Sequence, residues 1–287
     1  YILLILLAVL VVSILVSYAI TKTIIAPIEQ LGEHMDNIDE IKTYPELKPF
    51  VDKIKAQNEK KNLLDKQKKQ FTENVSHELK TPLTSIAGYA ELIENGMVNE
   101  ADIKPFAHTI RKQALRLVTL AEDIIKLSQL EETDEQLVFE EVNLTEIAED
   151  CLSALKINAC TRGISILFNP TENLYVRGNK SLLEELLYNL CDNAIRYNRE
   201  NGTVTVDISK KNQHTVLSVS DTGIGIPQKY QERIFERFFR VDKSRSKETG
   251  GTGLGLAIVK HIVQVHHAHL TLDSKENEGT AIQIQFE

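Results

Sequence analysis

The stretch FTENVSHELKTPLTS, residues 71–85, places a histidine beside a glutamate and a proline one turn later, inside an otherwise amphipathic helical pattern. Proline has no backbone donor, and its ring clashes with the carbonyl four residues earlier, which here belongs to Glu78. A segment selected only for helix stability would not contain it. The stretch therefore predicts a helix that has a functional role around His77.

A helical wheel at about 100° per residue places His77 opposite the centre of an apolar stripe, and Thr81 one turn further on the same outer side. The stripe consists of Phe71, Val75, Leu79, Ile86, Tyr89 and Ile93. His77 is thus expected to face solvent. One ring nitrogen can then attack an electrophile while Glu78 takes the proton from the other, and the Thr81 hydroxyl can orient a water.

The octapeptide SHELKTPL, residues 76–83, resembles the phosphoacceptor box of sensor histidine kinases. The resemblance implies that His77 is phosphorylated on a ring nitrogen and that Glu78 is the base. It also implies that Thr81 supports dephosphorylation of a partner, so phosphatase activity is expected as well.

The box lies in a pattern that predicts an α-helical hairpin. One amphipathic helix is expected from Lys66 to about Asn95, a turn over 95–102, and a second helix from about Asp102 to Leu130, with apolar residues at three- and four-residue steps. Two helices make only a thin core, so pairing with a second copy into a homodimeric four-helix bundle is the natural solution.

After the acidic residues 131–136 the periodicity changes to that of a mixed α/β domain, one sheet with helices on a face. β-like runs are 164–169, 174–178, 203–209, 214–221, 269–274 and 280–286, and helical segments are expected at about 143–158, 180–198, 228–238 and 254–265.

The segment LLEELLYNLCDNAIRY, residues 182–197, sets four polar residues on one helix face. They are Asn189, Asn193, Arg196 and Tyr197. Amide oxygens can coordinate a hard cation such as Mg²⁺, an arginine can meet phosphate, and a tyrosine can stack on a base. The face predicts a nucleotide site with its metal.

Two glycine-rich motifs extend this prediction. In DTGIGIP (221–227), Asp221 can accept from an exocyclic amine, and Gly223 and Gly225 permit positive φ and close approach of a ligand. In GGTGLGLAIVKH (250–261), glycines precede and open a helix, whose free N–H groups favour phosphate. The candidates there are Gly251, Thr252, Gly253, Leu254 and Gly255, with Arg240 upstream and an expected lid over 243–250.

In their order these motifs resemble the Bergerat ATP-binding fold shared by histidine kinases, type II topoisomerases, the ninety-kilodalton chaperones and MutL. The resemblance implies an α/β sandwich in which Asn193, with Asn189, holds Mg²⁺, Asp221 reads adenine, and the lid glycines hold the phosphates of ATP. Arg196 stands where relatives often carry lysine. Arginine keeps the positive charge but changes the geometry of a phosphate contact.

Residues 1–20 contain no charge and predict a transmembrane helix, with a secretory signal as the alternative. Lys22 and the lysines over 53–61 then place the rest in the cytoplasm, under the plasma membrane. We expect a HAMP-like signalling linker over 21–65, a dimerisation and phosphotransfer domain over 66–132, and an ATP-binding domain over 137–287.

Other residue types add little. A net charge of −8 argues against nucleic-acid binding. The three cysteines have no ligand spacing and are expected to be small buried residues of a reducing compartment. His266, His267 and His269 are expected to be surface histidines rather than a metal site.

The sequence as a whole favours a membrane-bound, homodimeric sensor histidine kinase that phosphorylates itself on His77 from Mg·ATP and passes the phosphoryl group to an aspartate of a response regulator. Two alternatives stay open. One is an ATPase of the same fold that does not phosphorylate itself, and the other is a membrane scaffold without enzymatic activity.

Overall fold

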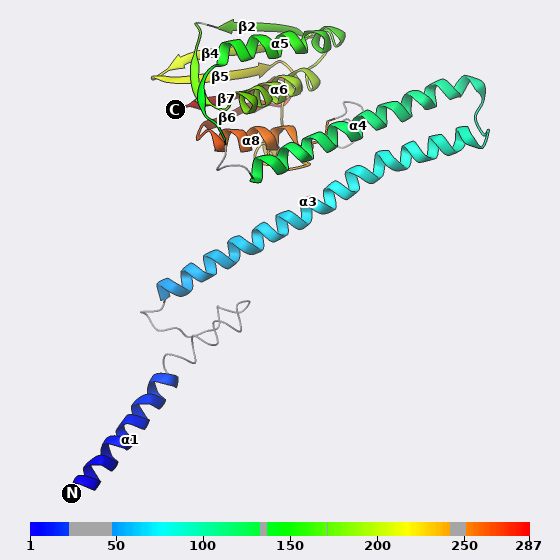
Figure 1. The fold of residues 1–287 in the computed structure, drawn as a ribbon. Helices are drawn as coiled ribbons and strands as arrows, with labels where there is room; N and C mark the ends of the chain where they lie inside the picture. Colours follow the sequence, from blue (N-terminus) through cyan, green and yellow to red (C-terminus); the bar gives the residue numbers. More distant parts are fainter. Residues whose placement is uncertain (23–47, 133–136, 171, 242–250) are drawn as a thin grey trace. The chain divides into compact units, whose positions relative to one another are not determined.

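A computed structural model describes residues 1–22, 48–132, 137–170, 172–241 and 251–287 of the chain (Figure 1). The chain forms two compact units, Tyr1–Ser76 and His77–Glu287, which are described separately. Three predicted segments lie wholly or partly outside the described residues: most of the linker (23–47), the end of the acidic stretch (133–136) and the whole lid (243–250).

The first unit contains helix α1 (Ile2–Ile20) and the first part of helix α3 (Lys48–Glu94). The helix predicted over 1–20 is present. Among the residues that the structure describes, however, no helix combines the length and the apolar character needed to cross a membrane, so the predicted transmembrane assignment is not confirmed. Helix α3 begins well before the predicted Lys66, and no break marks residue 65.

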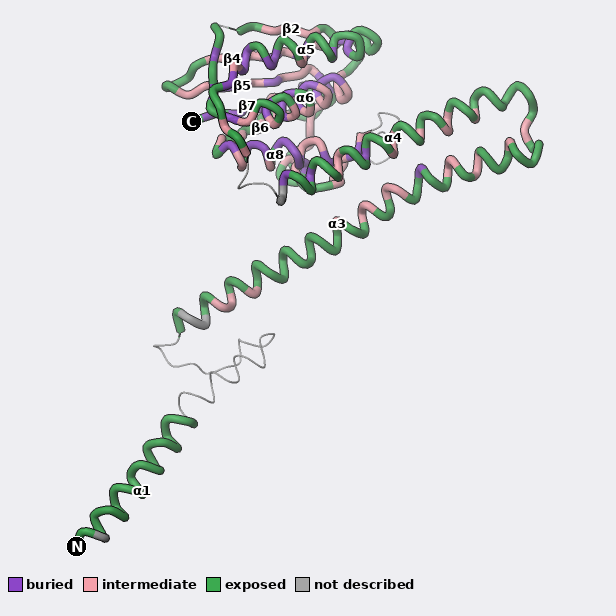
Figure 2. Tube along the Cα trace, viewed as in Figure 1, coloured by how far each residue is buried: buried purple, intermediate pink, exposed green. Residues whose placement is uncertain are grey.

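The second unit opens with the predicted hairpin, in which α3 continues through Pro82 to Glu94 and α4 runs from Glu100 to Glu132. The rings of Tyr89 and Phe106 meet edge-to-face with centroids 4.7 Å apart. Figure 2 shows that the hairpin helices carry mostly exposed and half-buried residues, whereas the α/β part contains most of the buried ones. The hairpin therefore has the thin core that its pattern predicts.

The α/β part is built on a five-stranded sheet in the order β2-β4-β5-β7-β6. Strand β2 pairs with β4 in parallel, and the other neighbours are antiparallel. The strands are β2 (Ser165–Pro170), β4 (Thr203–Lys211), β5 (His214–Asp221), β6 (His269–Lys275) and β7 (Gly279–Phe286). The predicted positions are confirmed within a few residues.

Three helices cover one face of this sheet, as Figure 1 shows: α5 (Leu144–Thr161), α6 (Lys180–Arg196) and α8 (Gly255–Val265). Alternate residues of β4 are buried beneath them, as period-two patterning requires. The core also contains the apolar faces of the helices, including Leu183, Leu186, Leu187, Ile258 and Ile262. Side chains of Asn143 and Asn179 cap the first turns of α5 and α6.

Two local predictions of secondary structure were incomplete. A separate two-stranded ladder of β1 (Glu140–Asn143) and β3 (Tyr175–Gly178) includes a strand that the sequence did not indicate. The helix expected over 228–238 is only the 3₁₀ turn η3 (Gln228–Tyr230) followed by further turns. Phe238 has a φ of 62°, a left-handed conformation that no α-helix contains.

The histidine and cysteine expectations need correction. His266 is only 8% exposed and lies against Phe139 and Phe286, whereas His267 and His269 are exposed. Its ring is buried because both nitrogens find backbone partners, Asn179 N and Ile262 O. All three cysteines are free, but only Cys191 is buried; Cys151 is half-buried and Cys160 is exposed.

Candidate functional site

His77 is exposed on the outer face of α3, as the wheel predicts, while the apolar stripe that it opposes is half-buried. Thr81 is also exposed, and its hydroxyl donates to the carbonyl of His77 at 3.2 Å. Pro82 continues the helix without an N–H, so Glu78 has no i+4 backbone donor. This surface can receive a second group at the imidazole.

Glu78 has partners that the sequence did not indicate. Its Oε2 accepts from Arg116 Nη2 on α4 at 3.0 Å and from Arg240 Nη2 at 3.1 Å. Arg240 belongs to the segment between the two glycine motifs, so the carboxylate next to His77 contacts the α/β part directly.

The polar face of α6 has the composition of a magnesium site. Both Nδ2 donors of Asn189 are directed to Glu185, to its backbone oxygen at 2.9 Å and to its Oε1 at 2.8 Å. The Asn189 Oδ1 is thereby left as an acceptor, only 2.6 Å from where a Cβ on Gly255 would lie. Asn193 lies beside the same glycine. Two amide side chains at a helix N-terminus fit a hydrated Mg²⁺ with phosphate ligands.

Arg196 and Tyr197 end the same helix. The Arg196 guanidinium pairs with Asp192 one turn earlier, so a phosphate would compete with this carboxylate. The Tyr197 hydroxyl lies 3.2 Å from the position of a Cβ on Gly251, which brings the ring next to the second glycine motif. The structure thus brings Tyr197 to the second glycine motif and pairs Arg196 with Asp192.

The second glycine motif opens α8, and no side chain caps the first turn of that helix. Gly253 has a φ of 77° and accepts from the N–H of Phe238 at 2.8 Å. Leu254 is fully buried, so its side chain belongs to the core and only its backbone is available to a ligand. Thr252 donates from Oγ1 to Oδ2 of Asp123 on α4 at 2.6 Å.

Asp221 ends strand β5, and its Oδ1 accepts from the N–H of Gly223 at 2.7 Å. Burial raises the pKa of this carboxyl to about 6, against the lowering effect of backbone donors on Gly223 and Thr280. A Cβ on Gly223 would lie 2.3 Å from the Tyr197 carbonyl oxygen. Gly225 has a φ of 64°, and a Cβ there would meet the Lys275 carbonyl.

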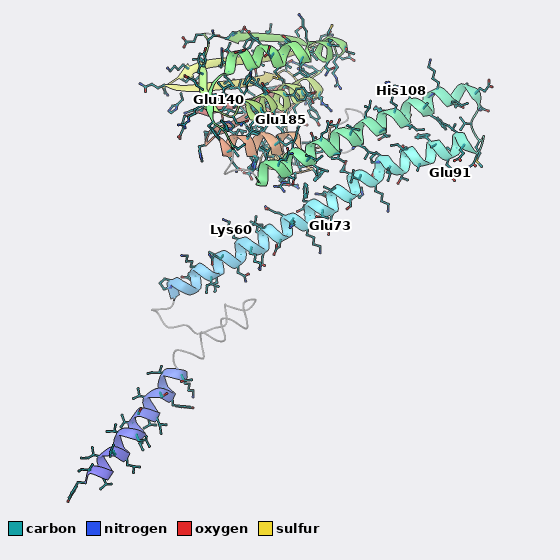
Figure 3. All side chains as sticks on the ribbon, viewed as in Figure 1. Lys60, Glu73, Glu91, His108, Glu140 and Glu185 are labelled. Atoms are coloured by element: carbon teal, nitrogen blue, oxygen red, sulfur yellow. The ribbon has the colours of Figure 1, made fainter. Side chains whose placement is uncertain are left out.

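Four residues around the site were missed in the sequence. Glu185, labelled in Figure 3, precedes Asn189 by one turn, so the spacing on α6 could have indicated it. The other three lie on α4 and had no local signal: Arg116, Asp123 and Lys126, whose ammonium pairs with Glu185 at 2.6 Å.

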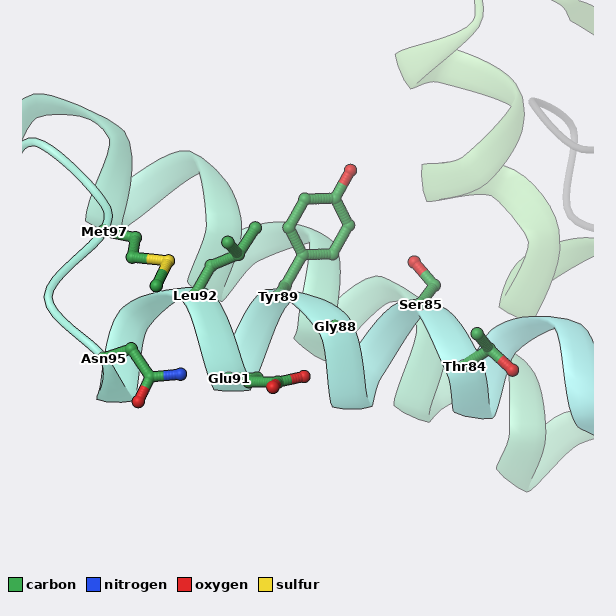
Figure 4. Close-up of a pocket in the computed structure, with 8 residues that line it drawn as sticks. All are labelled: Thr84, Ser85, Gly88, Tyr89, Glu91, Leu92, Asn95 and Met97. Carbon is green, nitrogen blue, oxygen red and sulfur yellow. The ribbon is translucent and has the colours of Figure 1, made fainter.

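An open groove of about 580 Å³ lies elsewhere, at the end of α3 and the following turn, and contains none of the predicted nucleotide residues. Figure 4 shows Tyr89, Leu92 and Met97 among its lining residues. It is separate from the candidate site.

Two family descriptions match the chain. "His Kinase A (phospho-acceptor) domain" matches residues 67–133, and "Histidine kinase-, DNA gyrase B-, and HSP90-like ATPase" matches residues 178–287. The chain belongs to the sensor histidine kinases. The first match contains His77, and the second contains the asparagine face and both glycine motifs, as the resemblance in the sequence implied.

Curated relatives carry the same family name. Sensor histidine kinase WalK of Bacillus subtilis is 36% identical over 219 residues, which are 75% of this chain and 36% of the relative. Sensor-like histidine kinase SenX3 of Mycobacterium bovis is 36% identical over 217 residues, 76% of this chain and 53% of the relative. The chain therefore spans between about a third and a half of these relatives.

Solved structures agree in fold. Histidine kinase ThkA in complex with response regulator protein TrrA superimposes with a TM-score of 0.63 at 23% identity, over 86% of this chain and 68% of that one. Acinetobacter baumannii histidine kinase AdeS gives 0.58 at 24% identity, over 74% and 97%. A full-length ShkA complex with AMPPNP gives 0.55 at 24% identity, over 74% and 44%.

Proposed function

We propose that this chain is the kinase part of a sensor that transfers the terminal phosphoryl group of Mg·ATP to His77. The observation that carries the proposal is the 3.1 Å contact between Arg240 Nη2 and Glu78 Oε2. Glu78 is adjacent to the exposed His77, and Arg240 lies between the two glycine motifs. The contact therefore joins the phosphoacceptor region to the predicted nucleotide site within one unit.

Each site residue has a separate role in the proposed reaction. A ring nitrogen of His77 attacks the terminal phosphorus, Glu78 accepts the proton from the other ring nitrogen, and Arg240 neutralises charge on the phosphoryl oxygens. The N–H groups at the start of α8 bind phosphate, Asp221 accepts from the adenine amine, and Tyr197 lies against the base. Asn189 and Asn193 would hold Mg²⁺, which supplies further charge neutralisation.

Further proposals concern the partners of the protein. The thin, half-buried core of the hairpin favours pairing with a second copy into a four-helix bundle. The ThkA neighbour was solved with a response regulator protein, which supports transfer from His77 to such a partner here. Exposed Thr81, one turn from His77, supports the proposed phosphatase activity toward that partner.

The domain limits and the membrane attachment are also proposals. We assign 21–65 to a signalling linker, 66–132 to dimerisation and phosphotransfer, and 137–287 to ATP binding. The uncharged sequence of α1 supports attachment through residues 1–20 and a cytoplasmic kinase part. Flotation of the chain with lipid vesicles, lost on deletion of residues 1–20, would test the attachment.

Labelling with γ-³²P-ATP tests the kinase assignment. We expect acid-labile, base-stable label on the wild-type chain and none on His77→Gln. His108→Gln, an exposed histidine on α4 labelled in Figure 3, is the matched control and should label normally. Unchanged label on His77→Gln would contradict the assignment, and ATP hydrolysis without any label would favour an ATPase.

A further inference from the structure

The carboxylate of Glu78 shares one oxygen between two arginines. Arg116 and Arg240 both reach Oε2, at 3.0 and 3.1 Å. The three side chains are 14%, 7% and 25% exposed for Arg116, Arg240 and Glu78. Partial burial strengthens such pairs relative to surface ion pairs, so these contacts fix the position of the carboxylate.

The two arginines differ in what holds them. Arg116 lies on α4, the hairpin partner of α3, so its contact with Glu78 belongs to the hairpin itself. Arg240 belongs to the α/β part, and its Nε lies 3.3 Å from where a Cβ on Gly253 would lie. Arg240 therefore lies between Glu78 and the glycine motif that opens α8, where the nucleotide phosphates are expected.

We propose that Arg116 is a positioning residue for Glu78, and that it alone retains the carboxylate when Arg240 turns from Glu78 to a nucleotide phosphate. This inference rests on the proposed function. Without Arg116, a Glu78 released by Arg240 would regain its rotamer freedom. Its carboxylate would then no longer be oriented toward the His77 ring. The guanidinium is suited to the task because its planar donors hold a carboxylate in a defined orientation.

The step that Arg116 supports is the phosphoryl transfer to His77. The N–P bond forms between one His77 ring nitrogen and the terminal phosphorus, and the bridging P–O bond breaks with its electron pair left on ADP. The proton on the other ring nitrogen passes to Glu78. Arg116 touches neither the phosphate nor the imidazole in this scheme and acts only through the carboxylate.

The test compares Arg116→Gln and Arg116→Lys with the wild-type chain, with Arg111→Gln, an exposed arginine on the same helix, as matched control. We expect Arg116→Gln to lower the rate of His77 labelling at saturating ATP ten- to hundredfold. The KM for ATP should stay within twofold, because nucleotide residues are untouched. Arg116→Lys should recover part of the rate, and Arg111→Gln should match the wild type.

A second comparison separates positioning from a structural role. In the Glu78→Gln background, Arg116→Gln should slow labelling no further, because the group on which it acts is gone. An equal slowing in both backgrounds, or a change in KM without a change in rate, would overturn the inference. Should Arg116→Gln not fold, Arg116→Lys in the two backgrounds gives the same comparison.

The labelling results also distinguish a failure of the proposed role of Arg116 from a failure of the proposed kinase function. A wild-type chain that does not label on His77 overturns both. A wild-type chain that labels on His77 while Arg116→Gln labels at the same rate leaves the kinase assignment intact and overturns the role of Arg116 alone.

Discussion

Thr252 in the second glycine motif donates a 2.6 Å hydrogen bond to Asp123 on helix α4, 129 positions earlier in the chain. Burial raises the pKa of Asp123, and the threonine hydroxyl acts in the opposite direction by stabilising the ionised form. Lys126, one turn further along α4, pairs with Glu185 beside the asparagine face. The hairpin thus holds residues that the nucleotide is expected to use.

Asp123→Ala should strengthen nucleotide binding. The substitution removes the acceptor and leaves Thr252 and its loop free to rearrange around phosphate, and a hydrogen bond to a charged group contributes about 1.5–3 kcal/mol. Other contacts also join the hairpin to the α/β part. We therefore expect Kd to fall several-fold, which is less than the full energy of this hydrogen bond would give. Calorimetric titration with a non-hydrolysable ATP analogue measures it.

Glu122→Ala is the control for this experiment, because it removes an exposed carboxylate from the adjacent position. It should leave the Kd unchanged. A Kd that is unchanged or higher in Asp123→Ala would show that the bond to Thr252 does not oppose nucleotide binding.

Gly255→Ala should abolish most binding of Mg·ATP. Its Cβ would lie 2.6 Å from Asn189 Oδ1, so either the amide or the first turn of α8 must move. Because the predicted metal ligand and the predicted phosphate donors meet there, we expect at least a tenfold loss of affinity. Gly88→Ala on α3 is the control, since its Cβ meets nothing within 4 Å and alanine favours a helix. Equal affinities in the two variants would contradict the assigned site.

Asp221→Asn should change the pH dependence of stability in a definite direction. The folded carboxyl keeps its proton up to a pH of about 6, whereas the unfolded one releases it near 3.8. The folded state is therefore favoured at low pH, and that contribution is lost as the pH rises from about 4 to 6. The loss amounts to at most about 3 kcal/mol.

Thermal unfolding followed by circular dichroism between pH 4 and 8 tests this prediction. The asparagine variant should gain stability relative to the wild type as the pH rises. Its affinity for ADP should fall more than tenfold, because the acceptor for the adenine amine is changed. A stability difference that is constant over the whole range would show that Asp221 does not carry the raised pKa.

Periodicity and local motifs predicted most elements of the fold. The alternation in β4 and the apolar face of α6 follow directly from burial on one side, so their positions could be read from the sequence. The failure at 228–238 has a local cause: Phe238 accepts a left-handed conformation because its N–H bonds to Gly253, a partner that lies outside any sequence window.

The site was predictable where its residues share one helix or one loop, as on α6 and at the start of α8. It was not predictable where α4 meets these elements. Arg116 and Asp123 look like ordinary polar residues of an amphipathic helix, and only the folded chain brings them to Glu78 and Thr252, over separations of 38 and 129 residues. Contacts of this kind depend on packing between elements, which no local pattern records.

His266→Phe should remove a pH-dependent contribution to the stability of the α/β part. Neutral His266 accepts from the N–H of Asn179, the N-cap of α6, through Nε2, and binds Ile262 O through Nδ1. Burial lowers the pKa of the ring, with His267 as the neighbouring titratable group. The unfolded chain therefore takes up the proton first, and the contribution of His266 is lost as the pH falls below about 6.5.

At pH 7 the phenylalanine variant should be about 1–3 kcal/mol less stable, because the Asn179 N–H loses its acceptor. Between pH 7 and 5 its melting temperature should fall less than that of the wild type. His267→Gln, at the exposed neighbouring position, should keep nearly the wild-type slope. A wild-type slope in His266→Phe would mean that the buried ring does not titrate in this range and that the pH dependence comes from other groups.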